Sequence, residues 1–108
     1  MEKNELLKGT LDMLILRSLE RAPRHGFSIA ETILQKSEDA LRVGEGSLYP
    51  ALYRLERRKW IAAEWGQSEN NRRAKYYRLT EKGRKQLEVQ ASHWKAMCAA
   101  ISRVMKTA

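Results

Sequence analysis

The stretch from residue 45 to residue 59 repeats its apolar positions with the period of an α-helix. These positions follow one another at i, i+3, i+4, i+7 and i+11, and they are Leu48, Ala51, Leu52, Leu55 and the stem of Lys59. The opposite face and its flanks carry hydroxyl, phenol and guanidinium groups, from Ser47, Tyr49, Tyr53, Arg54 and Arg57. Because proline is tolerated in the first turn of a helix, Pro50 predicts that this helix begins near Gly46, with Ser47 close to the capping position.

Beyond residue 59 the period changes from that of a helix to that of a strand. Alternate residues then share a side: Ile61, Ala63 and Trp65 point one way in a first strand, and Tyr77 and Leu79 point inward in a second. The segment between the strands, GQSENNRR, is rich in turn-forming residues. We therefore expect a β-hairpin whose tip carries the basic cluster Arg72, Arg73 and Lys75.

Two further helices are predicted upstream. The first covers about residues 9–22, ends before Pro23 and is apolar on more than one face, so that it lies between its own domain core and a second subunit. The second covers about residues 27–36, and in the link that follows Leu41 and Val43 alternate as in a short strand. The order helix, helix, helix, strand, strand predicts a winged helix-turn-helix, mainly α with a small β-hairpin, over residues 1–80.

A long helix is predicted for the C-terminal part, with Thr80 as its N-cap and an end near Val104. Its apolar residues form a heptad seam, spaced 4, 3, 4, 3 and 4 apart: Leu87, Ala91, Trp94, Cys98, Ile101 and Met105. Since such a helix is marginal alone, we expect residues 81–108 to form a dimerisation helix, joined at the interface by Leu11 and Leu14 of the first helix. The alternative is a helix folded back on its own domain.

The distribution of positive charge along the chain indicates which class of molecule the protein binds. The 108 residues form one domain or a domain with an appendage, and the segment from Arg42 to Lys85 carries +7 of the net charge of +8. This localisation favours nucleic acid over an anionic membrane surface or a merely solvated basic surface. A single cysteine excludes an intrachain disulfide, which fits a reducing compartment. The longest apolar run, Met13–Leu16, is too short to span a bilayer. We therefore expect a soluble, cytoplasmic protein.

No group of residues indicates catalysis or metal binding. The sequence has no nucleophile with a nearby base and orienting group, no glycine-rich phosphate loop and no paired acids at a plausible site. Two histidines and one cysteine without close spacing do not predict a metal site, and no cofactor is indicated. We therefore do not expect an enzyme.

A helix beside a basic hairpin suits the major groove of double-stranded DNA and its flanking phosphates. We expect Ser47, Tyr49, Tyr53 and Arg54 to enter the groove, with Arg57 on the backbone; Arg54 reads a base or grips a phosphate. The wing residues Arg72, Arg73 and Lys75 hold adjacent phosphates or probe the minor groove. Alternatively, the ring of Tyr49 packs against the first helix. A rival interpretation of the whole fold is a protein–protein adaptor that binds no DNA.

Trp94 supports a separate hypothesis. On a symmetric seam two copies of this indole come close together, and with Met97 they form an apolar slot for a flat ligand. The alternative is a large residue that fills the core of the dimer.

Five segments in this order resemble the PadR family of bacterial transcriptional regulators: LLKGTLDMLILRSL, HGFSIAETI, GEGSLYPALYRLERRKWI, AEWG and RRAKYYRLTEKG. The resemblance covers about residues 6–95, and the single C-terminal helix resembles the small PadR subfamily. It implies a winged-helix repressor that dimerises through its first and last helices, binds a palindromic operator and responds to a small hydrophobic effector. It also places residues 47–52 in the recognition helix and residues 72–77 in the wing.

The chain departs from the PadR pattern at two positions. Gly44 stands where many relatives have a polar capping residue, and Lys59 stands before Trp60 where glycine is frequent.

Overall fold

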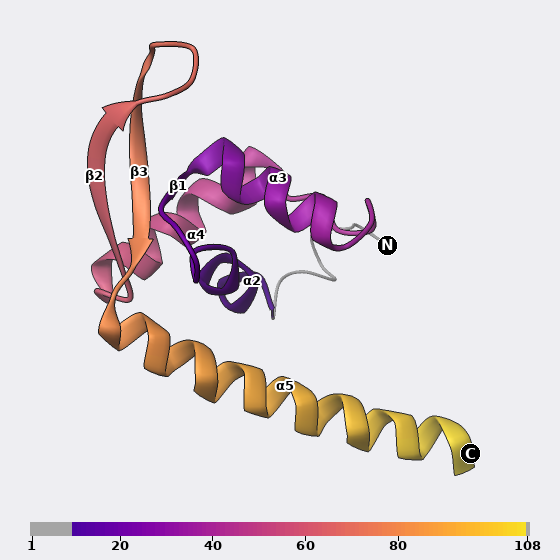
Figure 1. Ribbon diagram of the computed structural model, residues 1–108. Coiled ribbons are helices and arrows are strands. Elements are labelled where there is room, and N and C mark those ends of the chain that lie inside the picture. The colour runs from indigo at the N-terminus through magenta and orange to yellow at the C-terminus, as the bar shows by residue number, and fades with distance from the viewer. Residues whose placement is uncertain (1–9, 108) are drawn as a thin grey trace.

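The computed structural model describes residues 10–107 (Figure 1). Its elements are α2 (Leu11–Ser18), β1 (Arg24–His25), α3 (Gly26–Lys36), α4 (Glu45–Arg57), β2 (Ile61–Gln67), β3 (Arg73–Leu79) and α5 (Glu81–Thr107). This order confirms the predicted winged helix-turn-helix with a long C-terminal helix. Residues 1–9 and 108, which belong to the predicted N-terminal domain and C-terminal helix, lie outside the described residues.

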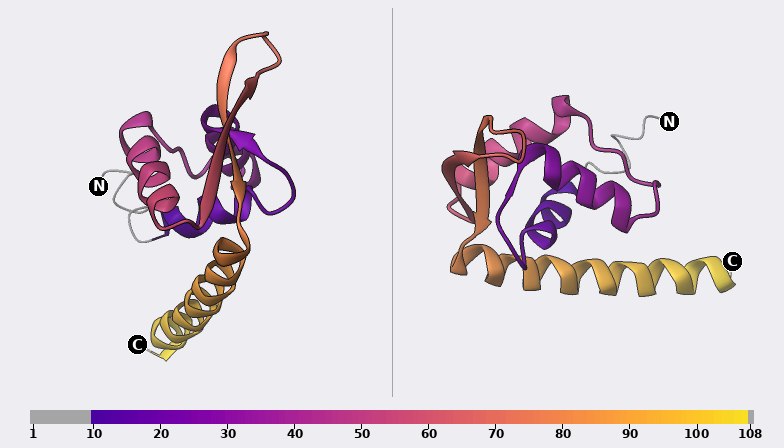
Figure 2. Two further views of the ribbon diagram at one scale, coloured as in Figure 1. Left: turned by 90° about the vertical axis from the view of Figure 1, so that its left-hand side faces the viewer. Right: turned by 45° about the horizontal axis from the view of Figure 1, so that its top comes forward.

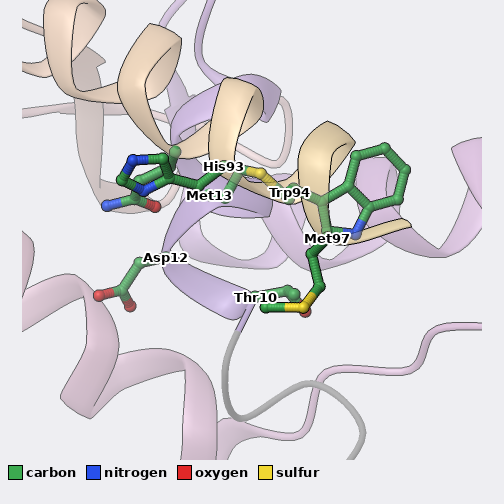
Figure 3. Close-up of a pocket in the computed structure, with 7 residues that line it drawn as sticks. Thr10, Asp12, Met13, His93, Trp94 and Met97 are labelled. Atoms are coloured by element: carbon green, nitrogen blue, oxygen red, sulfur yellow. The ribbon is translucent and has the colours of Figure 1, made fainter. Parts of the chain in front are cut away.

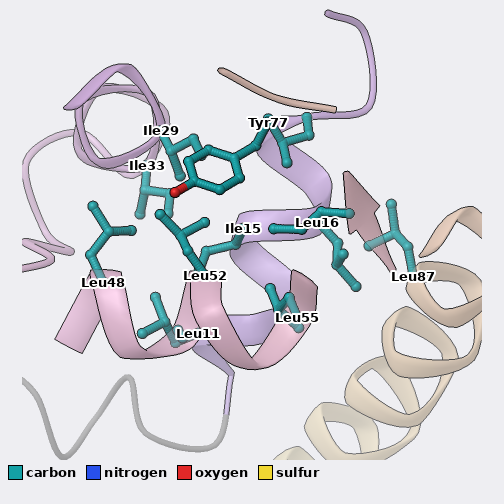
Figure 4. Close-up of a cluster of buried hydrophobic side chains, with 13 residues drawn as sticks. Leu11, Ile15, Leu16, Ile29, Ile33, Leu48, Leu52, Leu55, Tyr77 and Leu87 are labelled. Atoms are coloured by element: carbon teal, nitrogen blue, oxygen red, sulfur yellow. The ribbon is translucent and has the colours of Figure 1, made fainter. Parts of the chain in front are cut away.

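The helices α2, α3 and α4 pack around one core, on which Leu87 of α5 and Tyr77 of β3 also converge (Figure 4). The apolar face of α4 is buried as its spacing predicts, with Leu48, Ala51, Leu52 and Leu55 all at most 2% exposed. At about 25 cal/mol per Å² of buried apolar surface, such a face contributes more to stability than any intrinsic helix propensity. The core therefore fixes which side of α4 faces outward.

The sheet has the order β1-β3-β2, with both strand pairs antiparallel. The hairpin of β2 and β3 confirms the period-two prediction, while β1, which pairs Arg24 with Tyr77 and His25 with Tyr76, lies between two predicted helices where no strand was predicted. Two residues are too few to show a period. Arg24 is also held from outside the sheet, because its Nε donates to the carbonyl oxygen of Ser18 at 2.8 Å.

Trp65 shares a side of β2 with the buried Ile61, as the alternation predicts, but it is exposed because the hairpin extends beyond the helices (Figure 1). Two sequence-based details are wrong. The helix α2 ends at Ser18 and not near residue 22. No strand forms at Leu41 and Val43; the N–H of Leu41 instead donates to the Ser37 hydroxyl at 2.9 Å, which closes the turn after α3.

The start of α4 also differs from the prediction. The helix begins at Glu45, and Gly44 is its N-cap residue without a side-chain cap, so Ser47 lies inside the first turn. The carbonyl oxygen of Gly44 accepts from the N–H groups of Ser47 and Leu48 at 3.1 and 2.9 Å. Pro50 therefore falls in the second turn, and the carbonyl of Gly46 loses the N–H donor that any other residue would supply there.

The end of α4 is a Schellman turn. The N–H of Lys59 donates to the carbonyl oxygen of Glu56 at 3.0 Å, and the N–H of Trp60 donates to that of Leu55 at 3.1 Å. Lys59 takes a left-handed conformation with φ of 64°. A left-handed residue is ordinarily glycine, which explains why glycine is frequent before Trp60 in the PadR pattern. Lys59 adopts this conformation although it carries a side chain.

The first turn of α5 is fastened to this junction. Thr80 caps the helix as predicted, since its hydroxyl accepts from the N–H of Gly83 at 3.0 Å and lies 2.7 Å from the carbonyl oxygen of Lys59. Gly83 is in close contact with the backbone, because a Cβ there would stand 1.9 Å from the carbonyl oxygen of Trp60. From this anchor α5 crosses beneath α2 and extends past it (Figure 2).

Candidate nucleic-acid interface

The outward face of α4 presents Tyr53 and Arg57 together. Arg57 Nη1 donates to the phenol oxygen of Tyr53 at 3.4 Å, and its guanidinium carbon lies 5.7 Å from the centre of that ring. Helical spacing places Gly46 and Pro50 on the same face, where they add little bulk. The face thus combines hydrogen-bonding groups with room for close approach, which is what the floor of a DNA groove requires.

Tyr49 packs against α3 rather than the first helix, which corrects the alternative proposed from the sequence. A Cβ at Gly26 would meet the Tyr49 hydroxyl at 2.8 Å and Cε1 at 2.9 Å, so the ring lies against the first turn of α3. Tyr49 still exposes 46% of its surface. Its ring therefore has a packing role and keeps an accessible edge.

The hairpin, or wing, carries its cations on aromatic supports. The guanidinium carbon of Arg73 lies 4.5 Å from the centre of the Trp65 ring, and the amine of Lys75 lies 5.7 Å from that of Tyr77. Trp65 was not selected from the sequence as a functional residue, but the hairpin register could have found it. Trp65 pairs with Lys75, so Arg73 is its diagonal neighbour on the same face.

A tight turn forms the tip of the wing. The N–H of Ser68 donates to the carbonyl oxygen of Arg72 at 2.8 Å, the N–H of Asn71 donates to that of Ser68 at 2.9 Å, and Asn71 is left-handed with φ of 61°. Arg72 is exposed at this tip, next to Arg73. The two arginines are thus displayed on a hydrogen-bonded turn, which suits contacts with phosphates.

Both flanks of α4 are tied to neighbouring elements by ion pairs. Arg54 Nη2 lies 2.7 Å from Asp12 Oδ1 on α2, and Glu56 Oε1 lies 3.3 Å from Lys75 Nζ on the wing. Neither carboxylate was selected from the sequence, because only the fold brings residues so distant in the chain together. The ion pairs compensate part of the charge of Arg54 and Lys75, whereas Arg57 and Arg73 rest on aromatic rings.

A concave surface lies between the wing, α3 and α4. It encloses about 580 Å³, and its lining includes the aromatic residues Phe27, Tyr49 and Trp65 together with the charged residues Glu31, Glu69, Arg73 and Lys75. The two cations come from β3 of the wing, whereas Glu31 comes from α3 and Glu69 from the turn between β2 and β3. The two carboxylates equal the two cations in number, so only the part of this surface next to β3 favours an anionic backbone.

Tyr77 lies beneath this surface with a perturbed pKa. Burial raises the pKa of its phenol above the ordinary value of 10.0, nearby Lys75 lowers it, and Glu56 and Tyr49 raise it further. The phenol therefore stays neutral wherever the protein is folded at moderate pH. It serves as a packing residue under the wing.

Residues 15–89 match the transcriptional regulator PadR-like family. The chain belongs to this family. An uncharacterized protein of Lysinibacillus sphaericus is 28% identical over 106 residues, which is 98% of this chain and 97% of the relative. The PadR-like chain is accordingly a transcriptional regulator, and DNA is the partner that its family implies.

Solved structures agree with this family. A transcriptional regulator from Clostridium thermocellum has a TM-score of 0.83 and 27% identity, covering 92% of this chain and 96% of the other. A PadR family regulator from Eggerthella lenta has a TM-score of 0.81 and 28% identity, covering 97% and 89%. A PadR-like regulator from Bacillus cereus has a TM-score of 0.82 and 27% identity, covering 96% and 99%.

The predicted dimer residues of this PadR-like chain fall into three groups by exposure. Leu11 and Leu87 are 6% and 4% exposed and pack in the chain's own core. Leu14, Ala91 and Cys98 are half-buried, and the remaining seam residues, Trp94, Ile101 and Met105, are exposed. Of these, Trp94 lies opposite α2, while Ile101 and Met105 lie further along α5 toward its C-terminus.

Trp94 and Met97 line a cavity of about 360 Å³ between α2 and α5 of the same chain (Figure 3), and the slot between two copies of Trp94 stays a prediction. The other lining residues are Thr10, Asp12, Met13, Gln90 and His93. Within residues 10–107, no three His, Cys, Asp or Glu side chains are grouped to hold a metal ion, and no helix there is long and apolar enough to cross a membrane.

Proposed function

We propose that this PadR-like protein is a homodimeric, ligand-responsive repressor of the cytoplasm that binds a palindromic operator. The observation that carries the proposal is the joint display of Tyr53 and Arg57 on α4 beside the cations of the wing. The apolar side of α4 is fully occupied by the core, so its polar side is free for DNA. Residues 1–80 then form the DNA-binding domain, and residues 81–108 form the dimerisation helix.

In this proposal α4 enters the major groove. Tyr53 and Arg57 lead, the half-buried Ser47 and the accessible edge of Tyr49 contact the groove wall, and Arg54 lies on the flank. The wing residues Arg72, Arg73 and Lys75 follow the adjacent phosphates. A bidentate arginine contact with a guanine is worth about 1–3 kcal/mol of discrimination. Because Arg54 pairs with Asp12, we now expect most sequence preference from Arg57, which the sequence alone had placed on the DNA backbone.

Dimerisation is supported by the apolar side chains that α5 leaves exposed. Trp94 is 49% exposed, Ile101 53% and Met105 73%, and all three lie on the heptad seam. A second copy of α5 is the natural partner of such a seam. A two-fold dimer presents two copies of α4, and its operator is then a palindrome.

The response to an effector is supported by the cavity at Trp94. Three apolar or aromatic side chains, Met13, Trp94 and Met97, line it together with the polar residues Thr10, Asp12, Gln90 and His93, so it offers an apolar wall and groups that can orient a ligand. The exposed seam adjoins it, so a partner protomer can complete its walls.

The decisive experiment measures binding of the purified protein to its own upstream DNA and to scrambled DNA at 50 and 200 mM salt. If a dimer neutralises about ten phosphates, affinity falls by several orders of magnitude over this range. Arg57→Gln and Arg73→Gln should each weaken binding. Lys106→Gln, at the far end of α5, removes the same charge and should leave binding unchanged.

The alternatives give different results. Equal binding to both DNAs would refute sequence-specific regulation at this site. No binding at either salt concentration would refute the proposal and favour the adaptor interpretation, in which Arg57 and Arg73 are dispensable.

A further inference from the structure

The ion pair between Asp12 and Arg54 joins α2 to the proposed recognition helix. Arg54 Nη2 donates to Asp12 Oδ1 at 2.7 Å, and the two side chains are 49% and 24% exposed. Asp12 stands in the first turn of α2, where the helix dipole favours a negative charge. The less exposed carboxylate is thus held in the first turn of α2, and the more exposed guanidinium of Arg54 pairs with it.

Arg54 is near enough to the DNA-facing side of α4 to respond to phosphates. Three residues separate it from Arg57, which places the two side chains about 60° apart around the helix axis. A free guanidinium there would add one positive charge to the proposed interface in each protomer. Asp12 offsets that charge and directs the guanidinium toward α2, away from Tyr53 and Arg57.

We propose that Asp12 is a specificity-determining residue, which withholds Arg54 from DNA phosphates and so lowers affinity for non-operator DNA. This inference rests on the proposed function. Non-specific binding is almost wholly electrostatic, whereas operator binding also uses base contacts. In this proposal the base contacts of the operator complex hold α4 in a register in which Arg54 meets no phosphate. The withheld charge therefore weakens non-specific binding more than operator binding and raises the specificity ratio.

Asp12 also links the ion pair with Arg54 to the cavity between α2 and α5. It borders this cavity, and in Figure 3 its carboxylate extends from α2 toward α4 and away from Trp94. The same side chain thus borders the cavity and holds the flank of the recognition helix.

The substitution Asp12→Asn tests the proposal, because the amide keeps an oxygen acceptor for Arg54 and removes only the charge. We expect the variant dimer to bind scrambled DNA roughly three- to tenfold more tightly, with a smaller gain on the upstream operator. The dependence of log K on log salt should steepen by about 0.9 for each protomer. Asp12→Glu, which restores the charge, should return both quantities toward wild type.

Two further variants separate this role from other effects. Glu20→Gln removes an equal charge from a carboxylate that pairs with Arg17 outside α4, and it should leave the salt dependence unchanged. In an Arg54→Gln background, Asp12→Asn should have no further effect on DNA binding, because its action passes through Arg54. Thermal unfolding of each variant, measured in parallel, reports any purely structural contribution.

Several outcomes would overturn the proposal. Equal gains from Asp12→Asn and Glu20→Gln would show a general charge effect. Weaker binding of Asp12→Asn to both DNAs would show that Asp12 presents Arg54 to DNA. A lower melting temperature with unchanged salt dependence would leave Asp12 only a structural role. If wild type binds its operator in a salt-sensitive manner, these failures leave the proposed function intact; if wild type binds no DNA, both fall.

Discussion

The helices α4 and α5 have similar apolar periodicity but different surroundings. The stripe of α4 is buried by α2, α3 and the sheet, and none of Leu48, Ala51, Leu52 and Leu55 exceeds 2% exposure. The stripe of α5 is buried only at Leu87, and beyond it Trp94, Ile101 and Met105 remain exposed. Periodicity thus predicts which face of a helix is apolar, but only the fold shows whether the same chain covers that face.

This difference matters for function. Because the core occupies one side of α4, its other side is held outward in a fixed orientation, which suits recognition. The exposed part of α5 has no such cover within residues 10–107, and the proposed second subunit would supply it. The two helices should therefore respond differently to the same kind of substitution.

The largest expected effect comes from truncating a core residue of α4. Leu55→Ala removes a side chain that is 0% exposed, so we expect a loss of about 2–5 kcal/mol in the free energy of unfolding. The loss should be similar at low and high protein concentration, measured by urea denaturation, because the contacts lie within one chain.

Ile101→Ala in α5 is the matched comparison. If a second subunit covers this residue, its truncation should lower stability mainly by weakening dimerisation. The loss relative to wild type should therefore appear at protein concentrations where wild type is dimeric and disappear where wild type is monomeric. A loss equal to that of Leu55→Ala at every concentration would contradict the contrast between the two helices.

The next largest effect is expected where α5 is anchored. In Gly83→Ala the new methyl group would stand 1.9 Å from the carbonyl oxygen of Trp60. Because that oxygen belongs to the backbone, no side-chain rotamer change relieves the clash. We expect a loss of about 1–3 kcal/mol, measured by thermal or urea unfolding.

Gly46→Ala in α4 is the control, because nothing lies within 4 Å of its new Cβ. Alanine is the better helix former, so this variant should be more stable by about 0.5–1 kcal/mol. Losses of equal size in both variants would mean that close packing at Trp60 is not what Gly83 provides.

The third prediction concerns the end of α4. Lys59 has φ of 64°, a conformation that costs a side-chain-bearing residue about 1–2 kcal/mol and glycine almost nothing. After allowance for the greater flexibility of glycine in the unfolded chain, Lys59→Gly should stabilise the protein by about 0.5–1 kcal/mol. Differential scanning calorimetry at a fixed protein concentration would detect the shift.

Arg58→Gly provides the comparison, because Arg58 has a right-handed conformation with φ of −78°. Glycine there adds flexibility to the unfolded chain and removes the guanidinium that lies 5.0 Å from the centre of the Trp60 ring, so stability should fall. If both variants lose stability, strain at Lys59 is refuted.

Much of this architecture follows from local pattern, and the exceptions share a cause. The apolar face of α4, the hairpin and the Thr80 cap each depend on residues close in sequence, so periodicity and capping preferences predict them. The pair of Asp12 and Arg54 joins residues 42 positions apart, and no local pattern indicates it. Tertiary contacts likewise decide where α2 ends and why Trp65 is exposed beyond the helices.

The candidate site divides in the same way. Spacing alone places Tyr53 and Arg57 on the outward face of α4, and turn chemistry places Arg72 and Arg73 at the tip of the wing. The neighbours of the site residues cannot be predicted from nearby sequence. Glu56 pairs with Lys75, and Tyr49 packs against Gly26, only after the helices and the sheet have packed together. Sequence thus identified cationic and aromatic groups, while their partners required the structure.

The smallest expected effect concerns Tyr77, which packs beside α4. Burial and the nearby Glu56 raise the pKa of its phenol, so the folded chain holds this proton more tightly than the unfolded chain. Its contribution to stability is therefore complete below the ordinary value of 10.0 and is lost as pH rises through the higher folded pKa, by at most about 1.4 kcal/mol per pH unit.

Tyr77→Phe should flatten the stability profile above pH 10 relative to wild type, as measured by urea denaturation across pH. Tyr53→Phe, at an exposed tyrosine, should leave the profile unchanged. A parallel decline in the Tyr77→Phe variant and wild type would show that the alkaline loss arises elsewhere, and that Tyr77 supports α4 by packing alone.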